Sequence, residues 1–211
     1  MGKIVKRIVL TGGPSAGKSS SLDIIKEYLI NKDYVVYIVN ESATELIKSG
    51  IGPNISGLSL LAFQKYILKY QLFKENLIEK VALDENTEKD IVIIYDRGVI
   101  DNKAYITNNE FLDLLNEFNL NEEDLINKYD LVIHLETGAK GKFYRTDNNS
   151  ARWESIDEAI KRDTRTYEVW SKHNNLVKVK CYEEFVDKQN EIIRICEDNL
   201  NKKEVKRLKL V

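Results

Sequence analysis

The sequence has little cysteine, little proline and no long apolar run. Its 211 residues include two cysteines and two prolines. Cys181 and Cys196 stand in unrelated contexts. This excludes a disulfide framework and a cysteine-based zinc site, and it fits a reducing compartment, so we expect a cytoplasmic protein. No apolar stretch approaches the ~18 residues of a membrane-spanning helix. The short apolar run near the N-terminus turns straight into glycines, which predicts a strand rather than an export signal.

The charges are nearly balanced, with 32 basic and 34 acidic residues and a net charge of −2. This balance argues against a protein that binds nucleic acid over much of its surface. It is compatible with one local site for a small anion. Repeats, low-complexity segments and Pro/Gly/Ser linkers are absent from the sequence. We therefore expect one domain over residues 1–211, ending in a basic, solvated tail at 202–211.

Short apolar, β-rich runs alternate with longer helical patterns. This alternation predicts an α/β three-layer fold, in which a mainly parallel five-stranded sheet has helices on both faces. Ligands of such folds bind beyond the carboxyl ends of the strands. One helical pattern places Phe63, Tyr66, Ile67, Tyr70 and Leu77 on a single face, which we expect to be the inner one. The expected strands are 4–10, 35–39, 91–95, 131–135 and 176–179; the expected helices are 18–31, 58–83, 110–118, 121–128, 153–173 and 183–200.

A phosphate-binding loop follows the first strand. Residues 12–19 read GGPSAGKS and satisfy G-x-x-x-x-G-K-[ST], between an apolar strand and a helical pattern. Its glycines let backbone N–H groups point at a phosphate, Lys18 reaches the β- and γ-oxygens, and Ser19 holds Mg²⁺. The loop predicts a P-loop NTPase fold that binds ATP or GTP with Mg²⁺. The expected nucleotide-binding residues are Gly12, Gly13, Pro14, Ser15, Ala16, Gly17, Lys18, Ser19 and Ser20.

Charged residues follow two further strands. Glu41 comes after the second strand, and Asp96 with Arg97 comes after the third. A carboxylate at the tip of a central strand can hold Mg²⁺ or accept a proton from an attacking hydroxyl, and an arginine beside it can clamp a phosphate. The alternatives are a helix-capping role for Glu41 and a surface salt bridge for Asp96 and Arg97.

These features, in this order, resemble the small P-loop kinases. Within them the sequence is similar to the AAA-type ATPase and kinase group that includes nicotinamide-riboside kinase domains and the TRPL translocation defect proteins. Many families share the phosphate loop. The more specific blocks are DRGVIDNKAYI at 96–106, IHLETGAKGKFYR at 133–145 and RWESIDEA at 152–159. The resemblance runs from about residue 4 to about residue 188.

The resemblance implies roles for individual residues. In the similar deoxynucleoside kinases, a glutamate after the second strand is the base toward the acceptor hydroxyl, and a helix glutamine holds the acceptor. These roles fall on Glu41 and Gln64. The aspartate–arginine pair, here Asp96 and Arg97, handles Mg²⁺ and phosphate, so Ser19 and Asp96 are the expected metal ligands. Arg97 and Asp101 complete the implied acceptor-binding residues.

A basic segment with glycines at 138 and 141 follows the fourth strand, and residues 138–165 are the expected lid. A lid arginine can stabilise charge on the transferred phosphoryl group, and Arg145 and Arg152 are our candidates. Residues 161–165 are expected to form a solvated helix face. The predicted catalytic residues are Lys18, Glu41, Asp96, Arg97, Arg145 and Arg152.

The predicted activity is Mg²⁺-dependent phosphoryl transfer from ATP or GTP to a small hydroxyl acceptor, nucleoside- or riboside-like. The alternative is a nucleotide-dependent switch with slow NTPase activity. A polynucleotide 5′-hydroxyl kinase would need a basic groove that the composition does not indicate. Residues 127–130 read NKYD and match the guanine motif of GTPases, but they precede a strand and would lie at the wrong edge of the sheet.

Overall fold

The computed structural model describes residues 3–141 and 155–201. Its sheet has five strands in the order β2-β3-β1-β4-β5, and every neighbouring pair is parallel. The predicted five-stranded parallel sheet is confirmed. The strands are β1 (Val5–Gly12), β2 (Val35–Val39), β3 (Ile91–Asp96), β4 (Leu131–Leu135) and β5 (Leu176–Val179).

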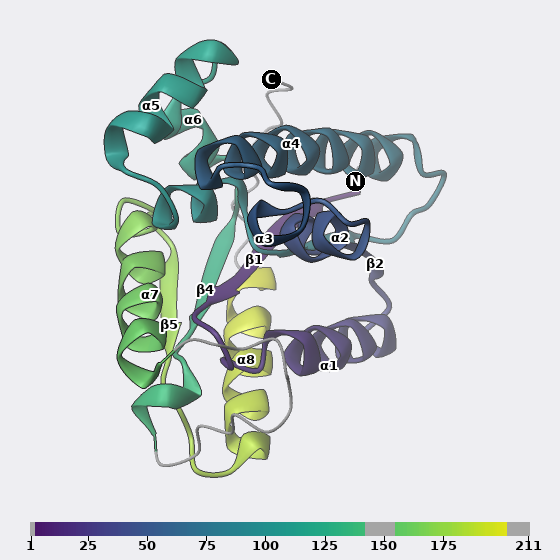
Figure 1. Cartoon of the computed structure of the whole chain (residues 1–211). Helices are drawn as coiled ribbons and strands as arrows, with labels where there is room; N and C mark the ends of the chain where they lie inside the picture. The colour runs from purple at the N-terminus through teal and green to yellow at the C-terminus, as the bar shows by residue number, and fades with distance from the viewer. Residues whose placement is uncertain (1–2, 142–154, 202–211) are drawn as a thin grey trace.

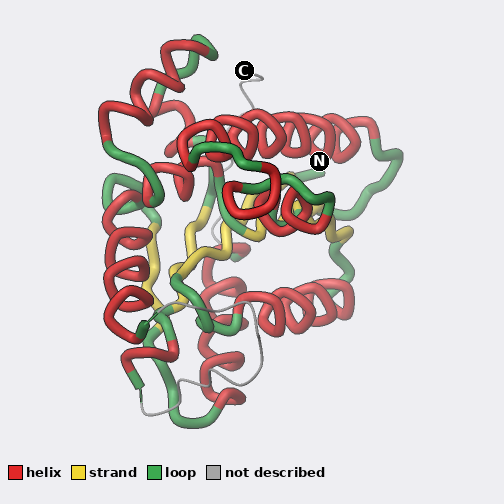
Figure 2. The backbone as a smooth tube through the Cα atoms, viewed as in Figure 1, coloured by secondary structure: helices red, strands yellow, loops and turns green. Residues whose placement is uncertain are grey.

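Helices cover both faces of the sheet (Figure 1). Figure 2 shows the strands as a central layer between helical segments. The sequence patterns did not predict two short helices, α2 and α3. The helices are α1 (Lys18–Asn31), α2 (Ser42–Lys48), α3 (Pro53–Ser56), α4 (Leu60–Asp84), α5 (Asn108–Glu117), α6 (Glu122–Asn127), α7 (Ile156–Val169) and α8 (Phe185–Leu200), with 3-10 turns η1 (Val99–Ala104) and η2 (Gly138–Lys140).

Successive strand residues pack into two separate cores. Val9 of β1 points to the core formed with α4, α5 and α6, to which Trp170 at the end of α7 also belongs. Ile8 and Leu10 point to the opposite core, formed with α1 and α8. Burial on both faces explains why β3 and β4 are apolar along almost their whole length rather than alternating. The three-layer fold is therefore as predicted.

The strand register brings the phosphate loop and Asp96 to one edge of the sheet. Leu10 of β1 pairs with Asp96 of β3, and Gly12 pairs with Leu135 of β4. The phosphate loop therefore leaves β1 between the ends of its two neighbours. The NKYD segment precedes β4 as expected, and Asp130 there accepts a hydrogen bond from the backbone N–H of Arg7 at 2.8 Å. That segment lies at the opposite edge.

Helix α4 buries Phe63 and Ile67 as expected, but other positions of the predicted inner face differ from the expectation. Tyr66 and Leu77, expected inside, are 47% and 48% exposed. Polar side chains are buried instead, among them Gln71 and Glu75. The Glu75 carboxylate accepts hydrogen bonds from the Tyr129 hydroxyl at 3.0 Å and pairs with Lys128 at 2.6 Å. These partners compensate the buried charge. No helix in the described ranges has the length and apolar character needed to span a bilayer.

Candidate active site

The phosphate loop runs from the end of β1 to the start of α1. At Gly12 the backbone has φ +144°, and an added Cβ would collide with the carbonyl oxygen of Leu135. Glycine is therefore required where the loop leaves the sheet. Gly17, with φ +80°, precedes the first turn of α1, and a Cβ there would lie 3.0 Å from the ring of Phe185.

Three carbonyl oxygens of this loop, those of Pro14, Ala16 and Gly17, bond to neighbouring parts of the protein. That of Pro14 accepts from the Thr137 hydroxyl at 2.5 Å, and that of Ala16 accepts from Lys188 Nζ at 2.9 Å. The carbonyl of Gly17 accepts from the backbone N–H of Ser21 at 3.0 Å. In a trans peptide the C=O and the following N–H point in opposite directions. The amides that follow these carbonyls therefore point to the other side of the loop, as a phosphate cradle requires.

Lys18 lies folded over the loop. Its Nζ is 3.3 Å from the carbonyl oxygen of Gly13 and 3.5 Å from that of Gly12. Burial and the charge of Arg97 lower the pKa of Lys18 to about 8, while Glu41 and Asp96 act in the opposite direction. A bound phosphate would restore the full charge of this lysine, because an anion nearby favours the ammonium form.

Asp96 ends β3 beside the loop. Within the described residues its Oδ1 is buried and has no hydrogen-bond partner. Burial and the neighbouring carboxylate of Glu41 raise the pKa of Asp96 to about 6. An unpaired, buried carboxylate oxygen is a fitting ligand for a hard cation, and the Ser19 hydroxyl stands in the exposed first turn of α1. The two residues fit Mg²⁺.

The described ranges contain no group of three or more His, Cys, Asp or Glu side chains arranged to hold a metal ion. Mg²⁺ in nucleotide sites uses one or two protein oxygens together with phosphates and water. A magnesium site of this kind therefore does not need such a group.

Arg97 and Glu41 form an ion pair between the ends of β3 and β2. Arg97 Nε is 2.5 Å from Glu41 Oε1, and its Nη1 lies 3.3 Å from both the Gly12 carbonyl and Asp101 Oδ1. Burial opposes ionisation of Glu41, but Arg97 and Lys18 outweigh it and lower the pKa to about 2. Glu41 stands at the N-cap position of α2, yet its carboxylate accepts no capping hydrogen bond from a backbone N–H of that helix and bonds instead to the Thr44 hydroxyl at 2.5 Å. The capping alternative is therefore wrong.

Asp101 holds Arg97 in place. Its side chain is nearly buried, and it accepts hydrogen bonds from the backbone N–H of Gly98 at 2.9 Å and from Trp170 Nε1 at 3.2 Å. The Thr11 hydroxyl donates to it as well. Arg97 has a positive φ of 69°. This backbone conformation is rare for arginine and is supported by the surrounding hydrogen bonds.

A cavity of about 210 Å³ opens next to the Glu41–Arg97 pair. Its walls come from α2, α4 and η1 and are mostly apolar. Gln64 lines the cavity and makes no hydrogen bond to any residue in the described ranges. Its amide can therefore serve a bound molecule. The charged residues that line the cavity are Glu41, Arg97 and Asp101.

Gln71 was missed by the sequence analysis. Its Nε2 donates to the Arg97 carbonyl at 3.1 Å and to Glu75 at 2.8 Å, and its Oε1 accepts from the Ser42 hydroxyl. Gln71 therefore holds the backbone of Arg97 from helix α4. Its spacing of seven residues from Gln64, which returns a helix to the same face, was the available signal.

The predicted lid is only partly described. Arg145 and Arg152 lie outside the described residues. Of the expected solvated face at 161–165, Lys161, Thr164 and Arg165 are exposed as predicted, whereas Asp163 is fully buried, which corrects the expectation at that position. The Arg162 guanidinium lies 4.8 Å from the centre of the Tyr105 ring, at the rim of the cavity. The burial of Asp163 follows from its contacts with Gly13 and His134 on other elements.

Residues 7–181 match the family described as AAA domain. The chain belongs to this AAA domain family. The fold is also similar to the crystal structure of thymidylate kinase from Ehrlichia chaffeensis, with a TM-score of 0.62 and 16% identity, covering 92% of this chain and 99% of that one. This likeness supports the P-loop kinase fold. No curated protein matches the sequence. The similarities to nicotinamide-riboside kinase domains and TRPL proteins stay predictions.

Proposed function

We propose that this AAA domain protein is a Mg²⁺-dependent phosphotransferase. It moves the γ-phosphoryl group of ATP or GTP to a hydroxyl of a small, nucleoside- or riboside-like acceptor. The observation that carries the proposal is the position of the Glu41–Arg97 pair. Arg97 contacts the carbonyl of Gly12 in the phosphate loop, and Glu41 lines the adjacent cavity. One ion pair therefore joins a donor site to an acceptor site.

In this proposal the loop amides and Lys18 hold the triphosphate. Asp96 and Ser19 hold Mg²⁺, which neutralises charge on the phosphates when bound. Arg97 clamps the transferred group, and Glu41 accepts the proton of the acceptor hydroxyl. The ion pair keeps Glu41 ionised but makes it a weak base. The negative charge of a phosphoryl group bound at Arg97 would offset the effect of this guanidinium on Glu41, so the pKa of Glu41 would rise and strengthen it as a base.

The cavity supports an acceptor without a phosphate. Its charged lining in the described ranges is two carboxylates and one guanidinium, and both carboxylates already bond to that guanidinium. A phosphate-bearing acceptor would meet net negative charge there. A neutral, flat molecule would meet apolar walls such as Phe63 and Tyr105, and the free amide of Gln64.

The two cysteines are unpaired, and we place the activity in the cytoplasm.

A panel of nucleosides, ribosides and their monophosphates, each with ATP or GTP and Mg²⁺, tests the proposal by mass spectrometry of the products. We expect a new monophosphate from an unphosphorylated acceptor, and none from the Lys18→Ala protein. Nucleotide hydrolysis that no acceptor changes would favour the alternative, a nucleotide-dependent switch. Absence of both binding and turnover would overturn the proposal.

A further inference from the structure

We infer that Asp163 of helix α7 is a positioning residue for the phosphate loop. It holds the first turn of the loop in the conformation that receives a triphosphate. The inference rests on the proposed function only in requiring that a nucleotide binds at the loop. Asp163 touches no expected substrate position itself, so its effect acts through the loop backbone.

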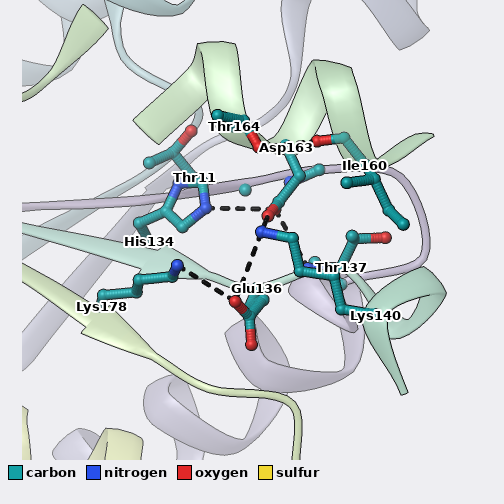
Figure 3. Close-up of polar contacts among 12 residues, drawn as sticks. Thr11, His134, Glu136, Thr137, Lys140, Ile160, Asp163, Thr164 and Lys178 are labelled. Atoms are coloured by element: carbon teal, nitrogen blue, oxygen red, sulfur yellow. Dashed lines mark hydrogen bonds and ion pairs between the residues drawn. The ribbon is translucent and has the colours of Figure 1, made fainter. Parts of the chain in front are cut away.

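The Asp163 carboxylate is completely buried and has four hydrogen-bonding partners. Its Oδ1 accepts from the backbone N–H groups of Gly13 at 3.1 Å and Thr137 at 3.0 Å, and it lies 3.1 Å from His134 Nε2. Its Oδ2 is 2.8 Å from Lys140 Nζ. Figure 3 shows His134, Thr137 and Lys140 converging on this carboxylate. Helix α7 is thereby bonded to the loop and to the end of β4.

The approach at Gly13 leaves no space for a side chain. A Cβ there would lie 2.7 Å from Asp163 Cβ and 2.9 Å from its Oδ1. The loop backbone therefore rests directly on the carboxylate-bearing turn of α7. A shift of Asp163 moves the Gly13 peptide, and that peptide precedes the amides that would contact the phosphates.

A second contact extends the same support. Thr137, whose backbone amide is held by Asp163, donates its hydroxyl to the Pro14 carbonyl at 2.5 Å. Asp163 therefore holds Gly13 directly and holds Pro14 through Thr137. Lys140 also reaches Glu136 at 3.4 Å, and Glu136 pairs with Lys178 at 3.0 Å (Figure 3). The carboxylate is thus anchored to the ends of β4 and β5.

The chemistry of the site favours a positioning role over simple packing. An ionised carboxylate in the interior is unfavourable unless several donors satisfy it, and an apolar side chain would fill the space without that requirement. Here the donors come from the phosphate loop, β4 and η2, and none comes from α7. Burial opposes ionisation of Asp163, but His134 and Lys140 hold its pKa well below the usual range. The charge is therefore maintained at the loop.

The first test compares Asp163→Ala with Thr166→Ala. Thr166 is on the same helix and is equally buried, and its hydroxyl has no hydrogen-bond partner in the described ranges. Both substitutions remove buried atoms and lower thermal stability. Only Asp163→Ala should weaken nucleotide binding, by about tenfold or more, since it removes the acceptor of two loop-positioning amides. The readout is the Kd of a fluorescent ATP or GTP analogue with Mg²⁺.

A second pair of variants decides the matter if Asp163→Ala does not fold. Asp163→Asn and Lys140→Met both remove the Asp163–Lys140 ion pair. Only the first replaces the carboxylate that accepts from Gly13 and Thr137 by a neutral amide, which accepts more weakly. We expect Asp163→Asn to weaken nucleotide binding several-fold while Lys140→Met changes it less than about twofold.

The outcomes separate this inference from the proposed function. If the wild-type protein binds no nucleotide, the proposed function fails. If the wild type binds nucleotide and Asp163→Ala or Asp163→Asn binds it as tightly as its matched control does, the positioning role is overturned while the proposed function stands. Selective loss of nucleotide affinity in the Asp163 variants, at stability equal to that of the controls, supports the inference.

Discussion

Glu41 and Arg97 meet at 2.5 Å, although 55 residues separate them in the sequence. They follow the ends of two adjacent strands, β2 and β3, and those ends meet at one edge because the strands are parallel. Arg97 also contacts the phosphate loop at Gly12. The pair therefore lies between the loop and the apolar cavity, where a phosphoryl group would pass from donor to acceptor.

Glu41→Gln should lower the rate of phosphoryl transfer by roughly 10²–10⁴-fold, the usual contribution of a general base. Nucleotide affinity should stay near that of the wild type, because Glu41 lines the acceptor cavity. Steady-state kinetics together with equilibrium nucleotide binding check both parts. Glu45→Gln is the matched control, since Glu45 lies one turn further along α2 and pairs with Lys74 outside the cavity lining. Loss of nucleotide affinity in Glu41→Gln would instead place Glu41 on the donor side.

The ionisation of Glu41 also makes the free energy of unfolding depend on pH in the acid range. Its pKa is lowered from 4.5 to about 2 in the folded protein, so its carboxylate stabilises the fold above pH 4.5. That contribution, on the order of 3 kcal/mol, is lost as the pH falls from about 4.5 to about 2. The difference in unfolding free energy between wild type and Glu41→Gln should shrink over this interval. Denaturant unfolding at several pH values measures it, and a constant difference would contradict the ion pair.

Lys18→Ala should abolish nucleotide binding while the fold survives. The side chain lies across the loop and contacts backbone carbonyls, so its removal affects little apolar packing. Thermal shift with and without nucleotide and Mg²⁺ measures the effect. Lys26→Ala, an exposed position on the same helix α1, is the control and should behave as wild type. A wild-type nucleotide-dependent shift in Lys18→Ala would refute the assignment of the loop.

Asp96→Asn should raise the Mg²⁺ concentration required for nucleotide binding by about tenfold or more, because a neutral amide is a weaker ligand for a hard cation. The same substitution removes a buried carboxylate oxygen that lacks a hydrogen-bond partner in the described ranges, so the fold should tolerate it. Titration of Mg²⁺ against fluorescent nucleotide binding tests this. Asp113→Asn, on the surface of α5, should leave the Mg²⁺ requirement unchanged. Equal requirements in both variants would remove Asp96 from the metal site.

Gln64→Ala should raise the KM for the acceptor by about tenfold while the KM for the nucleotide stays the same, since one hydrogen bond to the acceptor is lost. Tyr66→Ala is the control, because Tyr66 is exposed on the same helix. Initial rates at varied acceptor and nucleotide concentrations separate the two constants. A change in the KM for the nucleotide alone would show that the cavity is not the acceptor site.

Much of the fold could be predicted because its signals are local. Each of the five strands is a short run rich in β-branched and apolar residues, and each was placed to within two residues. The loop at 12–19 combines a spacing with a strand before it and a helix after it, so its position followed from the sequence alone. Parallel strands then brought Glu41, Asp96 and Arg97 to one edge.

The remainder depends on partners that are distant in the sequence. The apolar pattern placed Tyr66 and Leu77 inside, but the inner face of α4 also carries the polar Gln71 and Glu75. Lys128, Tyr129 and the backbone of Arg97 supply the partners of these two side chains. Asp163 similarly stands among charged residues of α7 and resembles a solvated position. Its burial depends on Gly13, 150 residues away. Composition and periodicity contain no information about such pairings.

In the proposed function, one site transfers a phosphoryl group from a nucleoside triphosphate to an uncharged hydroxyl acceptor. The most direct measurement is a single-turnover experiment with γ-³²P-labelled ATP or GTP, Mg²⁺ and an acceptor found in the panel, in which label on the acceptor and label released as phosphate are both counted. We predict that wild type places most of the label on the acceptor and that Glu41→Gln loses this transfer while it still binds nucleotide. Label that appears only as inorganic phosphate, with or without acceptor, would contradict the account.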